Sequence, residues 1–336
     1  MAPKRVMGLP SAVECGSCKV ESRTRICPTC HFELSHDIGQ IDQRIISIIG
    51  GRATGKTHYI VSLITRLQHE VGRNINLTVR MLGDNTQERW ERDFYTPLFV
   101  RKTLLQPNRP GAIDPTVKAP LMFRLTLTSG GKKRVLNMSF FDSAGEDMNS
   151  LDTLSIQARY ICHSHGIIFL LDPLQIQSVR DQLPSHVNAP VQDVKAAPDY
   201  IIDRLRNLFE RQQYVKANKK VKVPIAFTLS KVDTLFPLVE PGSALHRPGE
   251  HFGQVDLDDV QNVSTEISNY LGSWINPNFC NVIEDNFACY RFFGVSSLGG
   301  QPDANFHLAT VNPFRVEDPF LWILYELGLL KGKKVR

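Results

Sequence analysis

Residues 50–57 read Gly50-Gly51-Arg52-Ala53-Thr54-Gly55-Lys56-Thr57. They follow an apolar, β-branched stretch at 44–49 that predicts a buried parallel strand. After them, apolar residues recur at helical spacing over 58–67. A glycine-bounded loop between a strand and a helix is the setting of a phosphate-binding P-loop. The alternative, a strand-to-helix turn without a ligand, is disfavoured because both the pattern and its setting match.

The P-loop pattern predicts a role for each part of this run. Backbone N–H groups from residue 50 to His58 would surround phosphate oxygens, helped by the partial positive charge of the helix N-terminus. Lys56 would reach the β- and γ-phosphates, and the Thr57 hydroxyl would bind Mg²⁺.

The bulk composition excludes several classes of protein. The chain has 336 residues, 42% of them hydrophobic, which allows one large domain and an accessory module. It contains neither an apolar run of about 18 residues nor a long apolar N-terminal core, so we expect a cytoplasmic protein without a membrane span. A net charge of +5 does not by itself indicate nucleic-acid binding. The basic end, with Lys331, Lys333, Lys334 and Arg336, is interpreted as a solvated tail.

Four of the seven cysteines form two Cys-x-x-Cys pairs: Cys15 with Cys18, and Cys27 with Cys30. Two such pairs at this spacing predict a tetrahedral zinc site within a small ribbon at 13–36. A ribbon of this size has almost no core, so zinc would supply its folding energy. Two disulfides or a redox pair are the alternatives.

The stretch from 44 to 332 alternates strand-like and helix-like segments. This order predicts an α/β three-layer sandwich, a mostly parallel sheet with one antiparallel hairpin, preceded by the zinc ribbon. The hairpin joins 121–128 to 135–141 through a turn containing Gly130-Gly131. Further strands are expected at 166–171, 224–229 and 290–295, and helices at about 85–105 (capped by Asp84), 198–217 and 319–330. Stretches without periodicity predict insertions near 182–197, 235–256 and 299–318.

A second motif, Phe141-Asp142-Ser143-Ala144-Gly145-Glu146, ends the hairpin. Asp142 would hold a Mg²⁺-bound water, and the Gly145 N–H would contact the γ-phosphate. Thr116 lies just before the first hairpin strand, where a switch loop would end, so we expect it to contact Mg²⁺ when the γ-phosphate is present. A plain turn after Pro115 is the alternative for Thr116.

Two further segments predict recognition of guanine. In Leu229-Ser230-Lys231-Val232-Asp233, Asp233 would accept hydrogen bonds from guanine N1–H and N2–H, and the Lys231 stem would cover the base or ribose. A buried carboxylate discriminates strongly against a base that lacks these donors. In Ser296-Ser297-Leu298 a backbone N–H would donate to guanine O6.

With these four segments in order, the chain resembles GTPases of the translation-factor and Ras-like class. Within that class, 141–146 and Ile168–Leu174 resemble the bacterial double-GTPase (DO-GTPase) families, and the resemblance covers about 44–330. It implies Mg²⁺-dependent binding of GTP and GDP with hydrolysis of GTP. It also implies a place in multi-gene bacterial conflict, defence or signalling systems, with a companion GTPase and effector components.

Three residues depart from the class pattern. Ser230 replaces the usual Asn or Thr, Arg52 stands where small GTPases carry Gly, and Glu146 takes the place of the water-positioning Gln or His. Glu146 would act as a base or repel the γ-phosphate. We therefore expect slow turnover that a partner's arginine would accelerate.

The leading hypothesis is a GTP-hydrolysing molecular switch that docks protein partners through the zinc ribbon and the switch loops. One alternative is a nucleotide-gated scaffold with negligible hydrolysis. Another is a GTPase whose ribbon binds nucleic acid. The ribbon loop at 19–26 carries three basic residues, one acidic residue and no aromatic side chain for stacking, which disfavours nucleic acid.

Overall fold

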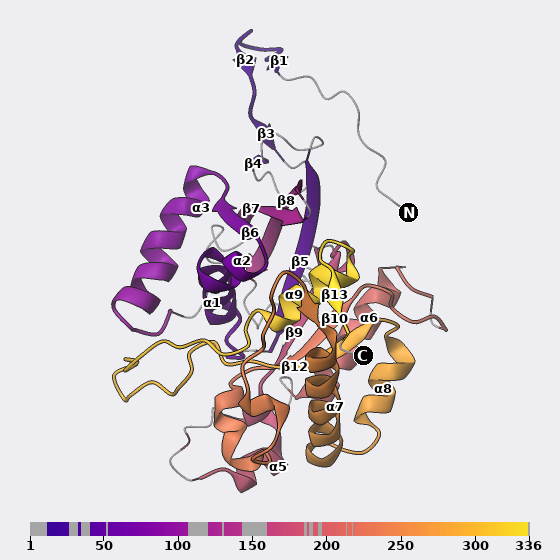
Figure 1. Cartoon of the computed structure of the whole chain (residues 1–336). Helices are drawn as coiled ribbons and strands as arrows, with labels where there is room; N and C mark the ends of the chain where they lie inside the picture. The colour runs from indigo at the N-terminus through magenta and orange to yellow at the C-terminus, as the bar shows by residue number, and fades with distance from the viewer. Residues whose placement is uncertain are drawn as a thin grey trace.

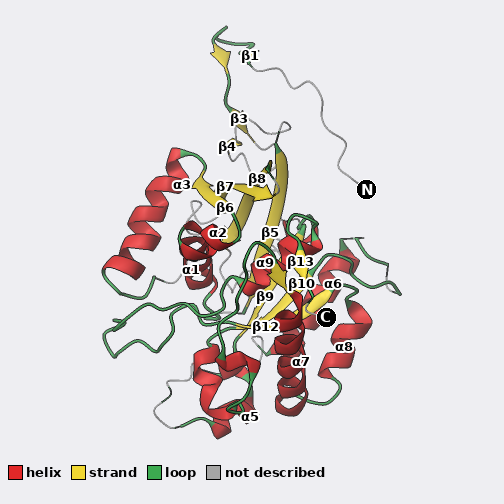
Figure 2. Cartoon of the chain, viewed as in Figure 1, coloured by secondary structure: helices red, strands yellow, loops and turns green. Residues whose placement is uncertain are grey.

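A seven-stranded sheet in the order β12-β10-β9-β5-β8-β7-β6 forms the centre of the molecule (Figures 1 and 2). β5 (Asp42–Gly50) lies in its middle. One side continues through β9 (Gly166–Leu171), β10 (Ile225–Leu229) and β12 (Tyr290–Gly294), and the other through β8 (Lys132–Asp142), β7 (Leu121–Ser129) and β6 (Leu77–Met81). The computed structural model describes residues 12–26, 33–34, 41–51, 53–106, 120–129, 131–142, 160–184, 187, 191–193, 197–212, 214–216 and 218–334.

The strand directions confirm the predicted mostly parallel sheet with an antiparallel hairpin. β5 runs parallel to β8 and β9, and β10 runs parallel to β9 and β12. β7 is antiparallel to both β8 and β6. β6 was not predicted from the sequence; it is a short edge strand whose exposed Thr78 and Arg80 alternate with buried neighbours. The carboxyl ends of five parallel strands share one edge, where α/β sheets bind ligands.

Helices cover both faces of the sheet and make the three-layer sandwich. α1 (Lys56–Gln68) and α9 (Asp318–Glu326) pack on one face, together with Ile168 and Leu170 of β9. α6 (Pro198–Arg211), α7 (Leu257–Trp274) and α8 (Phe279–Asn286) pack on the other, together with Ile167 and Phe169. This alternation follows from the two-residue period of a strand, and it divides the apolar core into two clusters.

Helix α9 lies at the centre of its face although it comes late in the chain (Figure 1). Phe320 contacts Phe140 of β8 at a ring-centroid distance of 6.1 Å, and Trp322 contacts Phe293 of β12 at 5.7 Å. Gly166 of β9 leaves room for Ile323, because a Cβ at position 166 would clash with the isoleucine side chain. One short helix therefore packs against three strands.

Several predicted boundaries are wrong. The helix expected at 85–105 is α3 (Asp84–Arg89) followed by a π-helix, η1 (Trp90–Val100), and Gly83 rather than Asp84 occupies the N-cap. Pro97 within η1 has no N–H to donate, and the left-handed Lys102 (φ 54°) ends the helical path before Leu105. α6 ends at Arg211 rather than 217.

The closing helix also ends early, at Glu326, because Gly328 turns the chain with φ 67°. The basic end beyond it is not a free tail. β13 (Gly332–Lys333) pairs with β11 (Val255–Asp256), and the Arg134 guanidinium donates to the Gly328 carbonyl. The side chains of Lys331, Lys333 and Lys334 are nevertheless exposed, as predicted.

The remaining elements are short. They are α2 (Glu70–Asn74), α5 (Gln177–Gln182), and the 3₁₀ turns η4 (Pro173–Gln175), η6 (Val232–Leu238) and η7 (Ala244–His246). Two of these turns and β11 lie in or run into the expected insertion at 235–256. No helix in the described ranges is long and apolar enough to cross a membrane.

Two small antiparallel hairpins occupy the predicted ribbon. β1 (Val13–Glu14) pairs with β2 (Glu21–Ser22), and β3 (Arg25–Ile26) pairs with β4 (Glu33–Leu34). Hydrogen bonds from the backbone N–H groups of Cys18 and Ser17 lower the pKa of the Cys15 thiol, which favours the thiolate form that binds metal. Cys27 and Cys30 lie outside the described residues. Among those described, no group of metal-binding side chains is present, so the zinc site stays a prediction.

Candidate nucleotide-binding site

The P-loop joins the end of β5 to the start of α1, as predicted. Gly50 has no room for a side chain, because a Cβ would lie 2.6 Å from the Leu170 carbonyl oxygen and 2.9 Å from Thr54 Oγ1. Gly55 occupies the N-cap of α1 with φ 85°, a conformation that favours glycine. Thr54 Oγ1 donates to the Gly51 carbonyl at 3.0 Å and closes the loop. The glycines therefore shape a compact cradle at a helix N-terminus.

The cradle fits phosphate. Lys56 is buried, and its Nζ donates to the carbonyls of Gly50 (3.1 Å) and Gly51 (3.0 Å). No acidic side chain occupies the first turn of α1, so the backbone N–H groups there present positive potential without local competition. Thr57 follows directly, half-buried. Arg52 lies outside the described residues.

The predicted magnesium and hydrolysis residues are only partly placed. The backbone of Asp142 ends β8 opposite Ile48 of β5, next to the P-loop strand. The side chain of Asp142, together with Thr116, Gly145 and Glu146, lies outside the described residues. Their predicted roles stay predictions.

Lys231 forms an ion pair that the sequence analysis missed. Its Nζ donates to Asp172 Oδ2 at 2.6 Å, and the Asp172 side chain is 0% exposed. Asp172 also accepts the Leu174 backbone N–H at 3.0 Å and caps η4. The position of Asp172, a charged residue directly after the buried strand 166–171, could have indicated that this strand end belongs to the site. The lysine stem predicted to cover the base is thus anchored at its tip.

Asp233 lies half-buried in η6 and makes no hydrogen bond or ion pair to the residues that the structure describes. Its neighbours are firmly held, since the Val232 N–H donates to the Val295 carbonyl at 3.0 Å. Ser230 Oγ donates to the Leu171 carbonyl at 3.2 Å. The carboxylate is therefore available to a ligand on a fixed backbone.

The segment Ser296–Leu298 lies against α1. Ser62 Oγ of α1 donates to the Ser297 carbonyl at 2.7 Å, and Ser296 Oγ accepts the Gly299 N–H at 2.9 Å. Strand register places this segment beside 230–233, because Leu229 pairs with Gly294. The structure thus brings the P-loop, Lys231–Asp233 and Ser296–Leu298 to one edge of the sheet.

The His58 side chain, for which the sequence predicted no role, connects α1 to another segment. Nε2 accepts the Leu105 backbone N–H at 3.1 Å, so the ring contacts the 101–106 segment. Burial, with a smaller contribution from the charge of Lys231, lowers the His58 pKa to about 4. The imidazole is therefore neutral at pH 7, as an acceptor must be.

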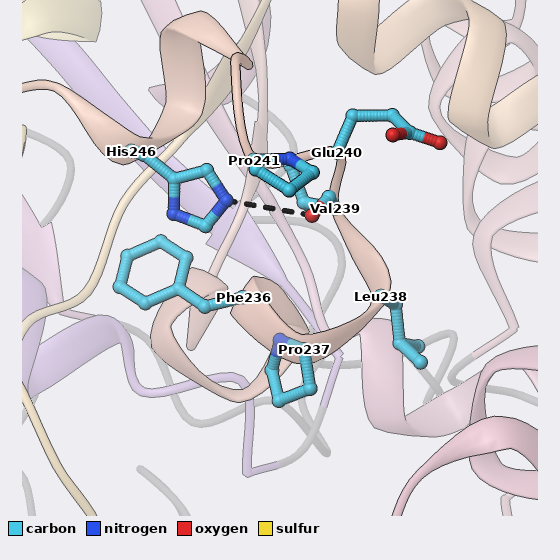
Figure 3. Close-up of a pocket in the computed structure, with 7 residues that line it drawn as sticks. All are labelled: Phe236, Pro237, Leu238, Val239, Glu240, Pro241 and His246. Carbon is cyan, nitrogen blue, oxygen red and sulfur yellow. Dashed lines mark hydrogen bonds between the residues drawn. The ribbon is translucent and has the colours of Figure 1, made fainter.

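A cavity of about 430 Å³ lies just beyond the guanine segment (Figure 3). It is lined by Phe236, Pro237, Leu238, Val239, Glu240, Pro241 and His246. The rings of Phe236 and His246 lie 5.2 Å apart, and His246 Nε2 lies 3.4 Å from the Val239 carbonyl oxygen. None of its lining residues belongs to the P-loop, so it is separate from the predicted phosphate site.

Comparison with known proteins agrees with this architecture. The family model described as Double-GTPase 2 (DO-GTPase2) matches residues 44–273, more than half of the chain. A protein of Mycolicibacterium smegmatis named "Putative ESX-1 scaffolding and assembly protein SaeC" is 29% identical over 329 residues, covering 91% of this chain and 80% of that protein. The family match starts at the P-loop strand and extends through the guanine segment into α7. The chain therefore belongs to the Double-GTPase 2 family.

Proposed function

We propose that this protein is a Mg²⁺-dependent switch that binds and hydrolyses GTP. The observation that carries the proposal is that a glycine cradle with a buried lysine lies on the same sheet edge as Asp233, a carboxylate without a partner among the described residues. The cradle suits a polyphosphate, and the carboxylate suits the paired N–H donors of guanine. Family membership supports the same class of ligand.

Residues of the cradle and of the neighbouring strand ends contribute to binding in this proposal. Lys56 supplies positive charge at the cradle, and its present carbonyl partners show that the ammonium lies within the loop. Thr57 and Asp142 would hold Mg²⁺, which when bound neutralises phosphate charge. Asp172 anchors the Lys231 ammonium, so the lysine stem is already ordered before a base binds.

Hydrolysis of GTP is the second part of the proposed activity. Gly145, Glu146 and Thr116 would serve it, and Arg52 would either add charge near the γ-phosphate or crowd the attacking water. Because Glu146 replaces the usual water-positioning residue, we propose slow turnover that a partner accelerates. Membership of a bacterial defence or signalling system with a companion GTPase is proposed from the family alone.

Direct titration tests the guanine assignment. Wild-type protein should bind GDP and GTP much more tightly than ADP and ATP. Asp233→Asn should weaken guanine binding and shift the preference toward xanthine nucleotides, because the amide can donate to the xanthine O2. Asp199→Asn, an exposed carboxylate in the first turn of α6, is the matched control. Equal affinity of the wild type for ATP and GTP would refute guanine recognition.

We propose that the N-terminal ribbon binds one zinc ion through Cys15, Cys18, Cys27 and Cys30 and docks a protein partner. The lowered pKa of Cys15 suits a metal ligand, and the relative's name as a scaffolding and assembly protein supports protein partners over nucleic acid. Elemental analysis should find about one zinc per chain. Cys27→Ser should lose zinc and keep GDP binding, whereas the control Cys289→Ser should keep both.

A scaffold that binds GTP without appreciable hydrolysis is the second candidate. The relative's name favours it, as do Arg52 and Glu146. Single-turnover hydrolysis, measured with and without candidate partners, separates the two: a switch cleaves bound GTP when its partner is present, and a scaffold does not.

A further inference from the structure

The expected insertion at 299–318 contains a loop with a closed neck next to the predicted guanine segment. Ser296 and Phe314 exchange backbone hydrogen bonds at 2.9 and 2.8 Å, and the Asn312 N–H donates to the Leu298 carbonyl at 2.9 Å. Gly299 (φ 77°) passes so close to the Asn312 carbonyl that a Cβ would clash. The base of the loop is therefore held firmly against the Ser296–Leu298 segment.

The far end of this loop pairs with the segment that follows η1. The Leu104 N–H donates to the Phe306 carbonyl at 3.0 Å, and the Leu308 N–H donates to the Lys102 carbonyl at 2.8 Å. Lys102 Nζ adds a bond to the Ala309 carbonyl at 3.1 Å, and Leu308 is buried in the core. Two segments about two hundred positions apart thus form a short antiparallel ladder centred on Thr103 and His307.

Both segments return to the same helix. Leu105, next to the ladder, donates its N–H to His58 Nε2, and Ser297, at the neck of the loop, accepts from Ser62 Oγ. His58 and Ser62 are four residues apart on α1, so they lie on one face of it. Hydrogen bonds therefore join three chain segments to α1 and to one another in a closed ring. The ring runs from α1 to 102–105, then to the 299–314 loop, and through 296–298 back to α1.

We propose that this ring fixes the distance between the base-binding loop and the P-loop helix, with His58 and Ser62 as positioning residues. The inference rests on the proposed guanine-nucleotide site. A ligand that contacts both regions at once gains affinity when they are already held in register, because less ordering is needed on binding. A ligand that contacts only the cradle gains nothing from the ring.

Two ligands distinguish these cases. Calorimetry in Mg²⁺ should show that His58→Ala and Ser62→Ala each weaken GDP binding about tenfold, while pyrophosphate binding changes less than about twofold. His58→Gln keeps a side-chain oxygen able to accept from Leu105 and should restore GDP affinity to within about threefold of wild type. The combined His58→Ala/Ser62→Ala variant should cost less than the product of the two single effects, because either break opens the same ring. Gln68→Ala, exposed at the end of α1, is the matched control.

Three outcomes would overturn the ring. They are GDP binding by the variants that equals that of the wild type, loss of GDP and pyrophosphate affinity by the same factor, and fully independent effects in the combined variant. Hydrogen exchange without nucleotide gives a separate readout. Amides of 102–106 should exchange faster in His58→Ala than in the wild type, and at the wild-type rate in Gln68→Ala. If wild-type protein binds no GDP at all, the proposed function fails, while this ligand-free exchange still reports whether the ring holds the segment.

Discussion

Replacing Lys231 with methionine should destabilise the protein in the absence of nucleotide. The substitution keeps most of the aliphatic stem and removes the only cation paired with Asp172 among the described residues. Asp172 is 0% exposed and would then keep a single donor among the described residues, the Leu174 N–H at 3.0 Å. A buried carboxylate that loses its partner is costly because water cannot replace the lost interaction.

The expected loss in the free energy of unfolding is about 2–3 kcal/mol. Removing one partner of a fully buried pair costs about 3–5 kcal/mol. Two features reduce that value here: the Lys231 side chain is 31% exposed, and the capping N–H continues to stabilise one carboxylate oxygen. Asp172→Asn removes the buried charge instead and leaves a lysine that can turn to water, so it should cost only about 1 kcal/mol.

Urea unfolding followed by tryptophan fluorescence measures these differences in nucleotide-free protein. The informative comparison is the double variant, in which Asp172→Asn should recover about 1 kcal/mol of the stability lost in Lys231→Met. Lys231→Arg, which keeps a cation, should lie close to wild type. If Lys231→Met costs less than about 0.5 kcal/mol, or if the two substitutions simply add, the ion pair does not stabilise the fold as argued.

Three further predictions follow from single positions. Gly50→Ala should abolish GDP binding in calorimetry, since its Cβ would lie 2.6 Å from a backbone carbonyl oxygen, whereas Gly242→Ala, with no atom within 4 Å, should bind normally. Gly166→Ala should lower the free energy of unfolding by about 1–3 kcal/mol, because Ile323 must move, and an unchanged urea midpoint would contradict this packing. The pKa of His58 is lowered from 6.5 to about 4, so between these pH values the imidazole is protonated in the unfolded chain and neutral in the folded chain. Stability should therefore fall as pH drops from about 6.5 to 4, by at most about 3 kcal/mol, and His58→Gln should remove that part of the pH dependence.

The sequence predicted the parts of the site that are local in the chain. Each motif lies within a few residues of a buried strand: the P-loop, Asp142 and Lys231 all follow such a strand directly. Because the carboxyl ends of parallel strands share one edge of a sheet, the location of the site could be predicted from these motifs. The ion pair between Asp172 and Lys231 could not be predicted, because its members lie 59 positions apart and only the register of β9 with β10 brings them together.

Helix α7 and the hydrogen-bonded order within the 299–314 loop were also not predicted, for different reasons. Helix α7 did carry a readable pattern: buried residues recur at 260, 263, 267, 271 and 274, and Asp256 caps its N-terminus by accepting from the N–H groups of Asp258 and Asp259. The loop at 299–314 carries none. Its order comes from backbone hydrogen bonds to a distant segment, and such bonds leave no trace in side-chain periodicity.

The central position of α9 has a consequence for the order of events during synthesis. Strands β8, β9 and β12 each pack part of their buried surface against a helix that the ribosome makes after all of them. Until residues 318–326 emerge, Phe140 and Phe293 lack the aromatic partners that cover them in the finished fold. Domains usually fold as units during translation, so part of this sheet face, beside α1, stays uncovered in the growing chain until α9 has been made. A nascent chain stalled before α9 should accordingly be a strong client of chaperones, and release of α9 should end that dependence.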